Sequence, residues 1–174
     1  MSTSLILTLK LDQTTFERTN TLRQQYFPPE RNVVPAHVIL FHQLPGDRES
    51  AISHSLETLC AQTKHFPFSL PSLQLLGNGV AISVSSPELM QLHKTLATNW
   101  DTWLIPQDRQ GYRPHITIQN KVKPETARQL YAELDAQWQP MTGWGEGLLL
   151  WYYHKGPWAL AREFCFAPES VEPP

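Results

Sequence analysis

Two short segments carry histidines in a pattern suited to acid–base chemistry: residues 37–40 read HVIL and residues 115–118 read HITI. Each segment lies in a β-branched, alternating stretch, which is typical of a strand. Successive strand side chains point to opposite faces, so each histidine shares a face with the residue two positions later, Ile39 or Thr117. Two imidazoles that converge on one substrate atom can accept a proton and donate one, which is what cleavage of a phosphodiester requires.

Each histidine also has a plainer interpretation, as an ordinary strand residue that is hydrogen-bonded within the fold. Thr117 has one too, because threonine is common at half-exposed strand positions. The matching placement of His37 and His115 favours a shared site over two unrelated positions. If the two side chains lay far apart, a scaffold for protein interactions would be the remaining interpretation.

Residues near the second histidine motif are candidates for substrate contact. Arg113 lies in the loop before His115, where a cation can meet a phosphate, and Tyr112 precedes it. Gln119 continues the face of Thr117, so we expect it at the edge of the cleft.

Three aromatic or histidine residues outside that loop complete the candidates. Trp151 and Tyr153 lie on a late strand, where an aromatic side chain can stack on a nucleobase. We expect His42 to point to the face opposite His37, toward the core or in a supporting position.

Composition and charge exclude several classes of protein. The chain has 174 residues, a net charge of −2 and two cysteines, Cys60 and Cys165. This charge argues against a sequence-independent nucleic-acid coat protein, and two isolated cysteines indicate free thiols rather than a disulfide scaffold. No apolar run reaches membrane-spanning length, and the ligand spacing of a metal site is missing. We therefore expect a cytoplasmic monomer without metal, cofactor, membrane contact or obligate protein partner.

Hydrophobic periodicity and turn residues predict alternating strands and helices. The paired residues Ser85 and Glu88 predict a capping box at the start of one helix, and the Gly77-Asn78-Gly79 turn predicts a hairpin. Residues 143–147 are expected to form a loop. The predicted strands cover residues 5–11, 37–43, 66–76, 79–85, 115–119, 148–153 and 159–166. The predicted helices cover residues 12–26 and 48–63, then begin near residues 86 and 124.

The order of these elements predicts an α+β fold with an internal repeat. Sliding the chain by 78 residues lays His37 on His115. We expect two pseudo-symmetric lobes around a central cleft, each a small antiparallel sheet with helices outside. The lobes are interleaved in a single domain over residues 1–166, and residues 167–174 form a flexible tail.

The two motifs resemble the paired His-x-Thr/Ser-x signature of the 2H phosphoesterase superfamily, and in particular its 2′-5′ RNA ligase and cyclic phosphodiesterase group. The segment RPHITI at residues 113–118 matches the second motif, including the proline before the histidine. The segment PAHVIL at residues 35–40 matches the first motif incompletely, because Ile39 stands in place of threonine or serine. The similarity in element order extends over nearly the whole chain.

The resemblance implies metal-independent cleavage, or reverse ligation, of 2′,3′-cyclic or 2′-5′ phosphodiesters. An RNA 3′ end or a small cyclic nucleotide would be the substrate, with His37 and His115 exchanging protons and Thr117 holding the phosphate. We assign His115 as the base and His37 as the acid. Ile39 cannot donate a hydrogen bond, and losing one to a charged oxygen costs about 1.5–3 kcal/mol. The alternative function is therefore a binding module of the same fold with weakened or lost catalysis.

Overall fold

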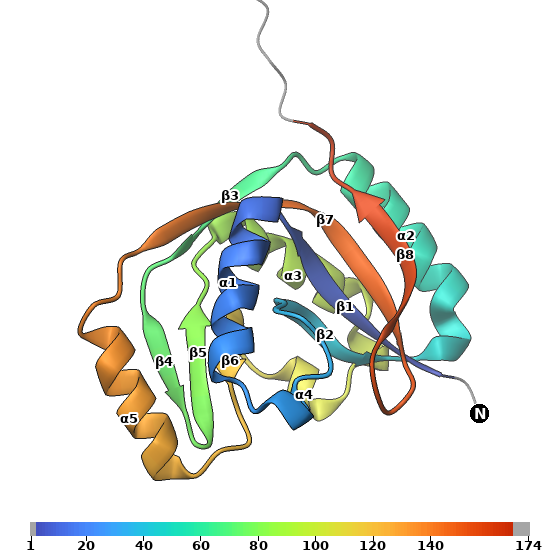
Figure 1. Cartoon of the computed structure of the whole chain (residues 1–174). Helices are drawn as coiled ribbons and strands as arrows, with labels where there is room; N and C mark the ends of the chain where they lie inside the picture. The colour runs from blue at the N-terminus through green and yellow to red at the C-terminus, as the bar shows by residue number, and fades with distance from the viewer. Residues whose placement is uncertain (1–2, 169–174) are drawn as a thin grey trace, which may run out of the picture.

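Two antiparallel sheets with flanking helices make up the protein, whose computed structural model describes residues 3–168 (Figure 1). The strands are β1 (Ser4–Leu11), β2 (Ile39–Leu44), β3 (Phe66–Leu70), β4 (Leu73–Leu76), β5 (Gly79–Ser83), β6 (His115–Gln119), β7 (Met141–Tyr153) and β8 (Ala159–Cys165). The α-helices are α1 (Gln13–Tyr26), α2 (Glu49–Ala61), α3 (Pro87–Asn99), α4 (Pro106–Arg109) and α5 (Pro124–Asp135). Short 3₁₀ helices cover Pro29–Arg31, Gly46–Arg48 and Asp101–Trp103.

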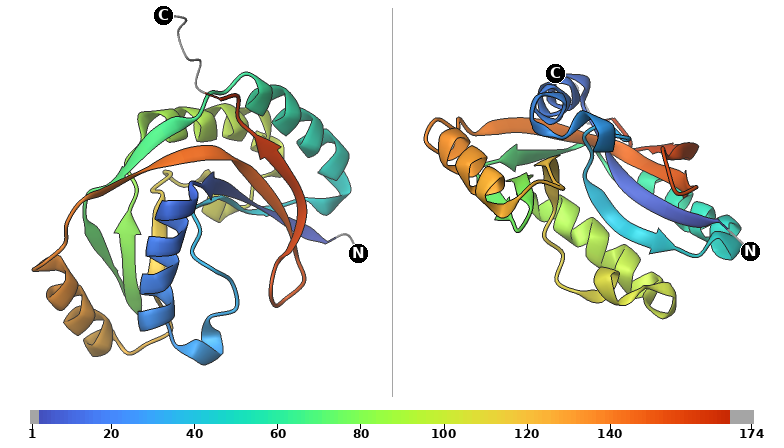
Figure 2. Two further views of the ribbon diagram at one scale, coloured as in Figure 1. Left: turned by 45° about the horizontal axis from the view of Figure 1, so that its top comes forward. Right: turned by 60° about the horizontal axis from the view of Figure 1, so that its bottom comes forward.

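The two sheets are unequal and draw strands from both halves of the chain. The larger sheet has the order β2-β1-β7-β3, with β8 also paired to β7, and the smaller sheet has the order β4-β5-β6. Helix α5 packs on β4 and β5, while α2 packs on β7 and β8. Helix α1 packs against β6 and β7, one strand of each sheet (Figure 2). The predicted α+β fold with two antiparallel sheets is confirmed.

The long strand β7 contradicts the predicted loop at residues 143–147. Its first part, Met141 to Gly145, pairs with β3, and the part from Gly145 to Tyr153 pairs with β1. The glycines that suggested a loop are needed because the strand is crowded by aromatic rings. A Cβ atom at Gly145 would lie 2.8 Å from a ring carbon of Phe66.

The single strand predicted over residues 66–76 is two strands in different sheets. β3 ends before Pro71 and pairs with β7, whereas β4 pairs with β5. Proline lacks the N–H that would continue the ladder, so the chain leaves one sheet there and enters the other. The predicted β4–β5 hairpin is confirmed, and Gly79 allows close approach, because a Cβ atom there would lie 1.9 Å from the carbonyl oxygen of Gln119.

Helix ends follow the sequence signals closely, with one shift. Helix α1 begins after Asp12, whose carboxylate accepts a hydrogen bond from the backbone N–H of Thr15. Helix α3 is capped by Ser86 rather than by the predicted Ser85. The backbone of Ser85 is hydrogen-bonded in both directions to Ser69 of β3, so the next serine takes the cap.

The core lies between the sheets and helices, and it is built from side chains of nearly every strand. β1 is buried on both faces over most of its length, and β2 and β7 pair with its two edges. No described helix is long and apolar enough to cross a membrane. Ala167 is hydrogen-bonded to Thr63 and His65, so the predicted flexible tail does not begin there. Residues 169–174 of that prediction lie outside the described residues.

Candidate active site

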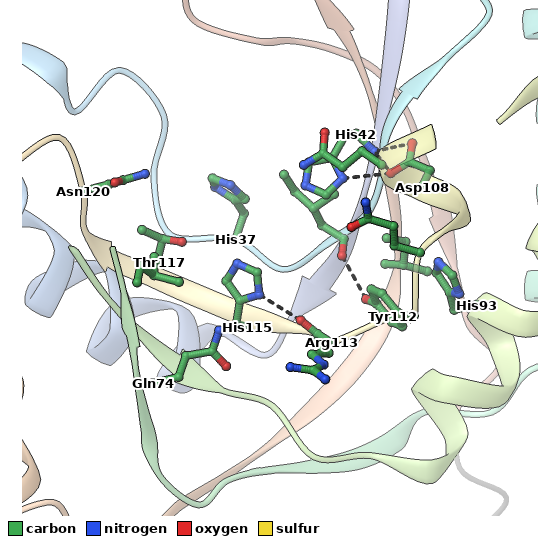
Figure 3. Close-up of a pocket in the computed structure, with 16 residues that line it drawn as sticks. His37, His42, Gln74, His93, Asp108, Tyr112, Arg113, His115, Thr117 and Asn120 are labelled. Carbon is green, nitrogen blue, oxygen red and sulfur yellow. Dashed lines mark hydrogen bonds and ion pairs between the residues drawn. The ribbon is translucent and has the colours of Figure 1, made fainter. Parts of the chain in front are cut away.

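A pocket of about 480 Å³ lies where β2 of the larger sheet and β6 of the smaller sheet come together, and it contains both predicted histidines (Figure 3). Side chains from the two sheets, from the segment before β2, from α3 and α4, and from the loop before β6 line it. The lining residues are His37, Ile39, Leu40, His42, Gln74, Leu76, His93, Gln107, Asp108, Gln110, Gly111, Tyr112, Arg113, His115, Thr117 and Asn120.

The two histidines are held in the same way. Nδ1 of His37 lies 2.7 Å from the carbonyl oxygen of Pro35, and Nδ1 of His115 lies 2.8 Å from that of Arg113. A carbonyl oxygen only accepts hydrogen bonds, so Nδ1 carries the proton in both rings. Nε2 is therefore the nitrogen of each ring that is left to exchange protons with a bound molecule.

The surroundings of His37 disfavour its charged form. Burial lowers the pKa of His37 from 6.5 to about 4, and the positive charge of Arg23 and the charged forms of His115 and His42 act in the same direction. The ring of Trp158 packs on one side of His37, with 4.7 Å between the ring centroids. His37 is therefore neutral at neutral pH, as a base must be before it takes a proton.

Thr117 lines the pocket two residues after His115, and a buried arginine supports it from behind. Arg23 of α1 donates from Nη1 to the backbone carbonyl of Thr117 (2.9 Å) and from Nε to Asn32 (2.8 Å). Burial lowers the pKa of Arg23 to about 10, which leaves the guanidinium charged at neutral pH. Among the described residues no ion pair joins it to a carboxylate, so its charge favours an anion in the pocket. Arg23 was not among the predicted site residues, because nothing in a polar helical pattern singles it out.

Ile39 lies in the pocket at the position where the family motif has a hydroxyl. Its carbonyl oxygen accepts a hydrogen bond from the hydroxyl of Tyr112 (2.9 Å), and the Tyr112 ring stacks on His93 at 3.9 Å. Burial raises the pKa of Tyr112, so the phenol stays protonated and keeps donating. Tyr112 thus lines the pocket while fixing the strand that carries Ile39.

His42 also lines the pocket, which contradicts its predicted placement on the opposite face from His37. Register shifts in the pairing of β2 with β1 are the reason: Thr8 faces Ile39, while Leu7 faces Phe41. The extra residue resets the alternation of side chains, as a β-bulge does. Leu40 and Phe41 are consequently both buried, and His42 turns toward the same side as Ile39.

Gln119 does not reach the pocket, so its predicted place at the cleft edge is wrong. Val80 pairs with Gln119 and Ala81 with Thr117, which leaves an extra residue in β6 between them. The shift turns Gln119 inward, where it is buried and its Oε1 has no hydrogen-bond partner among the described residues. Arg113, by contrast, lines the pocket as predicted.

Trp151 and Tyr153 lie outside this pocket, contrary to a direct stacking role within it. Trp151 donates from Nε1 to the Thr8 hydroxyl (2.9 Å) and, with Trp158, lines a separate apolar pocket of about 310 Å³. That second pocket shares His37 with the first. Tyr153 is exposed near the end of β7.

Metal ligands are not gathered anywhere in the described part of the chain. No group of three or more histidine, cysteine, aspartate or glutamate side chains there is arranged to hold an ion. Within the pocket, the one carboxylate, Asp108, is hydrogen-bonded to His42.

The fold is thus α+β with two antiparallel sheets, and the motif histidine just before β2 of the larger sheet shares a pocket with the one that begins β6 of the smaller sheet. The chain matches the family model of the 2′-5′ RNA ligase superfamily over residues 11–157, and it therefore belongs to that family. No match to this sequence was found among curated proteins.

Solved structures show the same fold at low sequence identity. TT0787 of Thermus thermophilus superposes with a TM-score of 0.70 at 15% identity, covering 96% of this chain and 100% of its own. E. coli LigT complexed with 3′-AMP gives a TM-score of 0.65 at 16% identity, covering 95% and 99%. A structure described as a phosphoesterase gives 0.63 at 14% identity, covering 95% and 99%. These similarities establish the architecture.

Proposed function

We propose that the protein cleaves 2′,3′-cyclic or 2′-5′ phosphodiesters of RNA ends or nucleotides, without a metal ion, and ligates them in the reverse direction. The observation that carries the proposal is the matched pair of histidines, His37 and His115, in one pocket. Each presents Nε2 because a backbone carbonyl oxygen two residues earlier accepts a hydrogen bond from its Nδ1–H. The free thiols Cys60 and Cys165 fit a cytoplasmic protein, and we propose that it acts as a monomer.

In this mechanism one histidine activates water and the other protonates the leaving oxygen. Nε2 of the neutral histidine takes a proton from water as the water oxygen bonds to phosphorus. The bond from phosphorus to the 2′ or 3′ oxygen then breaks, and that oxygen takes the proton from Nε2 of the second, protonated histidine. In-line displacement places the entering and leaving oxygens on opposite sides of phosphorus, which suits one imidazole from the segment before β2 and one from β6.

The burial of His37 favours the opposite roles from those that the sequence suggested. A histidine whose pKa is about 4 is unprotonated in the free enzyme at neutral pH, so it can accept a proton there but holds none to donate. We therefore assign His37 as the base for cyclic phosphodiester hydrolysis and His115 as the acid. The Thr117 hydroxyl donates a hydrogen bond to a non-bridging phosphate oxygen. The positive charge of Arg23, which bonds the backbone of Thr117, attracts the negative phosphate.

A second candidate function, binding of a phosphodiester without turnover, is favoured by Ile39 alone. Its side chain offers no donor to the phosphate on the His37 side of the pocket. The missing hydrogen bond weakens phosphate binding, but it does not remove the acid or the base.

Incubation of the purified protein with a 2′,3′-cyclic nucleotide, and separately with a 2′-5′-linked dinucleotide, tests the proposal. We expect product in the presence of excess EDTA at the same rate as in its absence. Activity that EDTA abolishes and zinc or manganese restores would contradict the mechanism. Tight binding of the cyclic nucleotide without product would support the binding module.

A further inference from the structure

Beyond the two motif histidines, His42 and His93 also line the pocket, and the orientation of the His42 ring is fixed. Nδ1 of His42 lies 2.8 Å from Oδ1 of Asp108, a carboxylate whose side chain is only 1% exposed, whereas the side chain of His42 is 40% exposed. Figure 3 shows the His42 ring between Asp108 and the space beside His37 and His115. The end of the ring away from Asp108 is therefore the end available to a bound molecule.

Asp108 is held rigidly enough to act as an anchor. Its two oxygens also accept from the backbone N–H groups of His42 (3.0 and 2.9 Å) and of Gln43 (3.1 Å). Burial alone would raise the pKa of Asp108, but these hydrogen bonds and the His42 ring lower it overall, so the carboxylate is ionised. The bulge in β2 thus serves two purposes: it turns His42 into the pocket, and the N–H groups of residues 42 and 43 bind the carboxylate that orients the ring.

His42 lines a pocket that lacks one of the two hydroxyl groups of the family motif. Thr117 offers a hydroxyl on the His115 side, whereas Ile39 offers none on the His37 side, and the two residues line one pocket with His42. The charged form of His42 acts on the pKa of His37, so the two rings are within electrostatic reach.

We propose that His42, oriented by Asp108, binds a non-bridging oxygen of the substrate phosphate in place of the hydroxyl absent at position 39. Nδ1–H donates a hydrogen bond to Asp108. A proton on Nε2 then makes the ring a cation, which donates a second hydrogen bond from Nε2 to the phosphate. His42 contacts the substrate and Asp108 is a positioning residue. The inference rests on the proposed function only in taking a phosphate as the ligand.

A double-mutant cycle between positions 39 and 42 tests this exchange of donors. Two quantities are measured: binding of adenosine 2′-monophosphate by NMR titration, and kcat/KM for a 2′,3′-cyclic nucleotide. We expect His42→Ala to weaken both by about ten- to a hundredfold, the usual effect of losing a hydrogen bond to a charged group. Ile39→Thr should restore a large part of that loss in the His42→Ala protein and change the parent much less.

Gln43→Ala is the matched control, because Gln43 is the exposed neighbour on β2, lies outside the pocket and bonds Asp108 only through its backbone. It should leave both quantities unchanged. His42→Gln, which keeps a neutral donor, should lose less than His42→Ala, and circular dichroism verifies that each variant is folded.

Each outcome separates this inference from the proposed function. Parent-like binding by a folded His42→Ala protein, or an equal gain from Ile39→Thr in both backgrounds, would overturn the role of His42. A parent that binds the nucleotide through His42 but never turns over a cyclic substrate would overturn the catalytic proposal alone. A parent that neither binds nor reacts would overturn both.

Discussion

Removing the indole of Trp158 should raise the pKa of His37 and move the acid limb of the pH–rate profile toward neutral pH. Loss of solvation is the largest cause of the low pKa, and the Trp158 ring packs on the imidazole at 4.7 Å. Trp158→Ala lets water reach that face of the ring. The pKa should therefore move from about 4 toward the ordinary value of 6.5.

The size of the effect follows from the two limiting pKa values. At about pH 5, a base with a pKa of about 4 is roughly nine-tenths neutral, whereas one with a pKa of 6.5 is only about 3% neutral. Full solvation of His37 would thus lower kcat/KM at that pH by about thirtyfold relative to its plateau, and Trp158→Ala should give part of that decrease. The assay is kcat/KM against pH for a 2′,3′-cyclic nucleotide, since this ratio reports the ionisation of the free enzyme.

Folding must be followed over the same range. A histidine with a depressed pKa stabilises the fold above its unfolded value of 6.5, and this contribution is lost as the pH falls from about 6.5 to about 4. Circular dichroism at each pH therefore accompanies the assay, and Trp144→Ala, on the exposed part of β7, is the matched control. An acid limb near pH 6.5 in the parent, or the same limb in the parent and Trp158→Ala, would refute the reasoning.

Two further predictions concern the support of the site. Arg23→Gln removes the buried charge next to Thr117, so KM for an anionic substrate should rise about tenfold, and an unchanged KM in a folded variant would contradict this. The acid limb of kcat/KM should also move to higher pH, because Arg23 lowers the pKa of His37. Gly79→Ala should lower the melting temperature markedly, because its Cβ atom would lie 1.9 Å from the carbonyl oxygen of Gln119. Gly77→Ala, which has open space around it, should leave the melting temperature unchanged, and equal melting temperatures of the two variants would contradict the prediction.

Regular alternation and turn residues were sufficient to predict most of the fold. Residues 115–119 and the Gly77 hairpin are where the sequence placed them, because period-two patterns and glycine turns act locally. The glycines of residues 143–147 were misread as a loop because their reason is non-local. The missing side chains leave room for aromatic rings of β3, for side chains of β1 and α1, and for the backbone of β8. These partners are distant in sequence, so no local pattern reveals them.

Two errors in the site, at His42 and Gln119, have one physical origin, the bulges in β2 and β6. An extra residue in a strand reverses the face of every side chain beyond it, and sequence does not show which residue is extra. His42 was consequently placed outside the pocket and Gln119 inside it, whereas the histidines before each bulge were placed correctly. Hydrogen bonds across the molecule, such as that between His42 and Asp108, could not be predicted either, because the partners are distant in sequence.

The central claim, that His37 and His115 act together on one phosphodiester, is tested most directly by the turnover of a 2′,3′-cyclic nucleotide in EDTA. The parent, His37→Ala, His115→Ala and the double variant are compared, with His54→Ala, an exposed histidine of α2, as the control. Each single variant should lose about a hundred- to ten-thousandfold in rate, and the double variant should be little slower than either, because the two groups serve one step. Parent-like turnover by either single variant, with His54→Ala also active, would contradict the account.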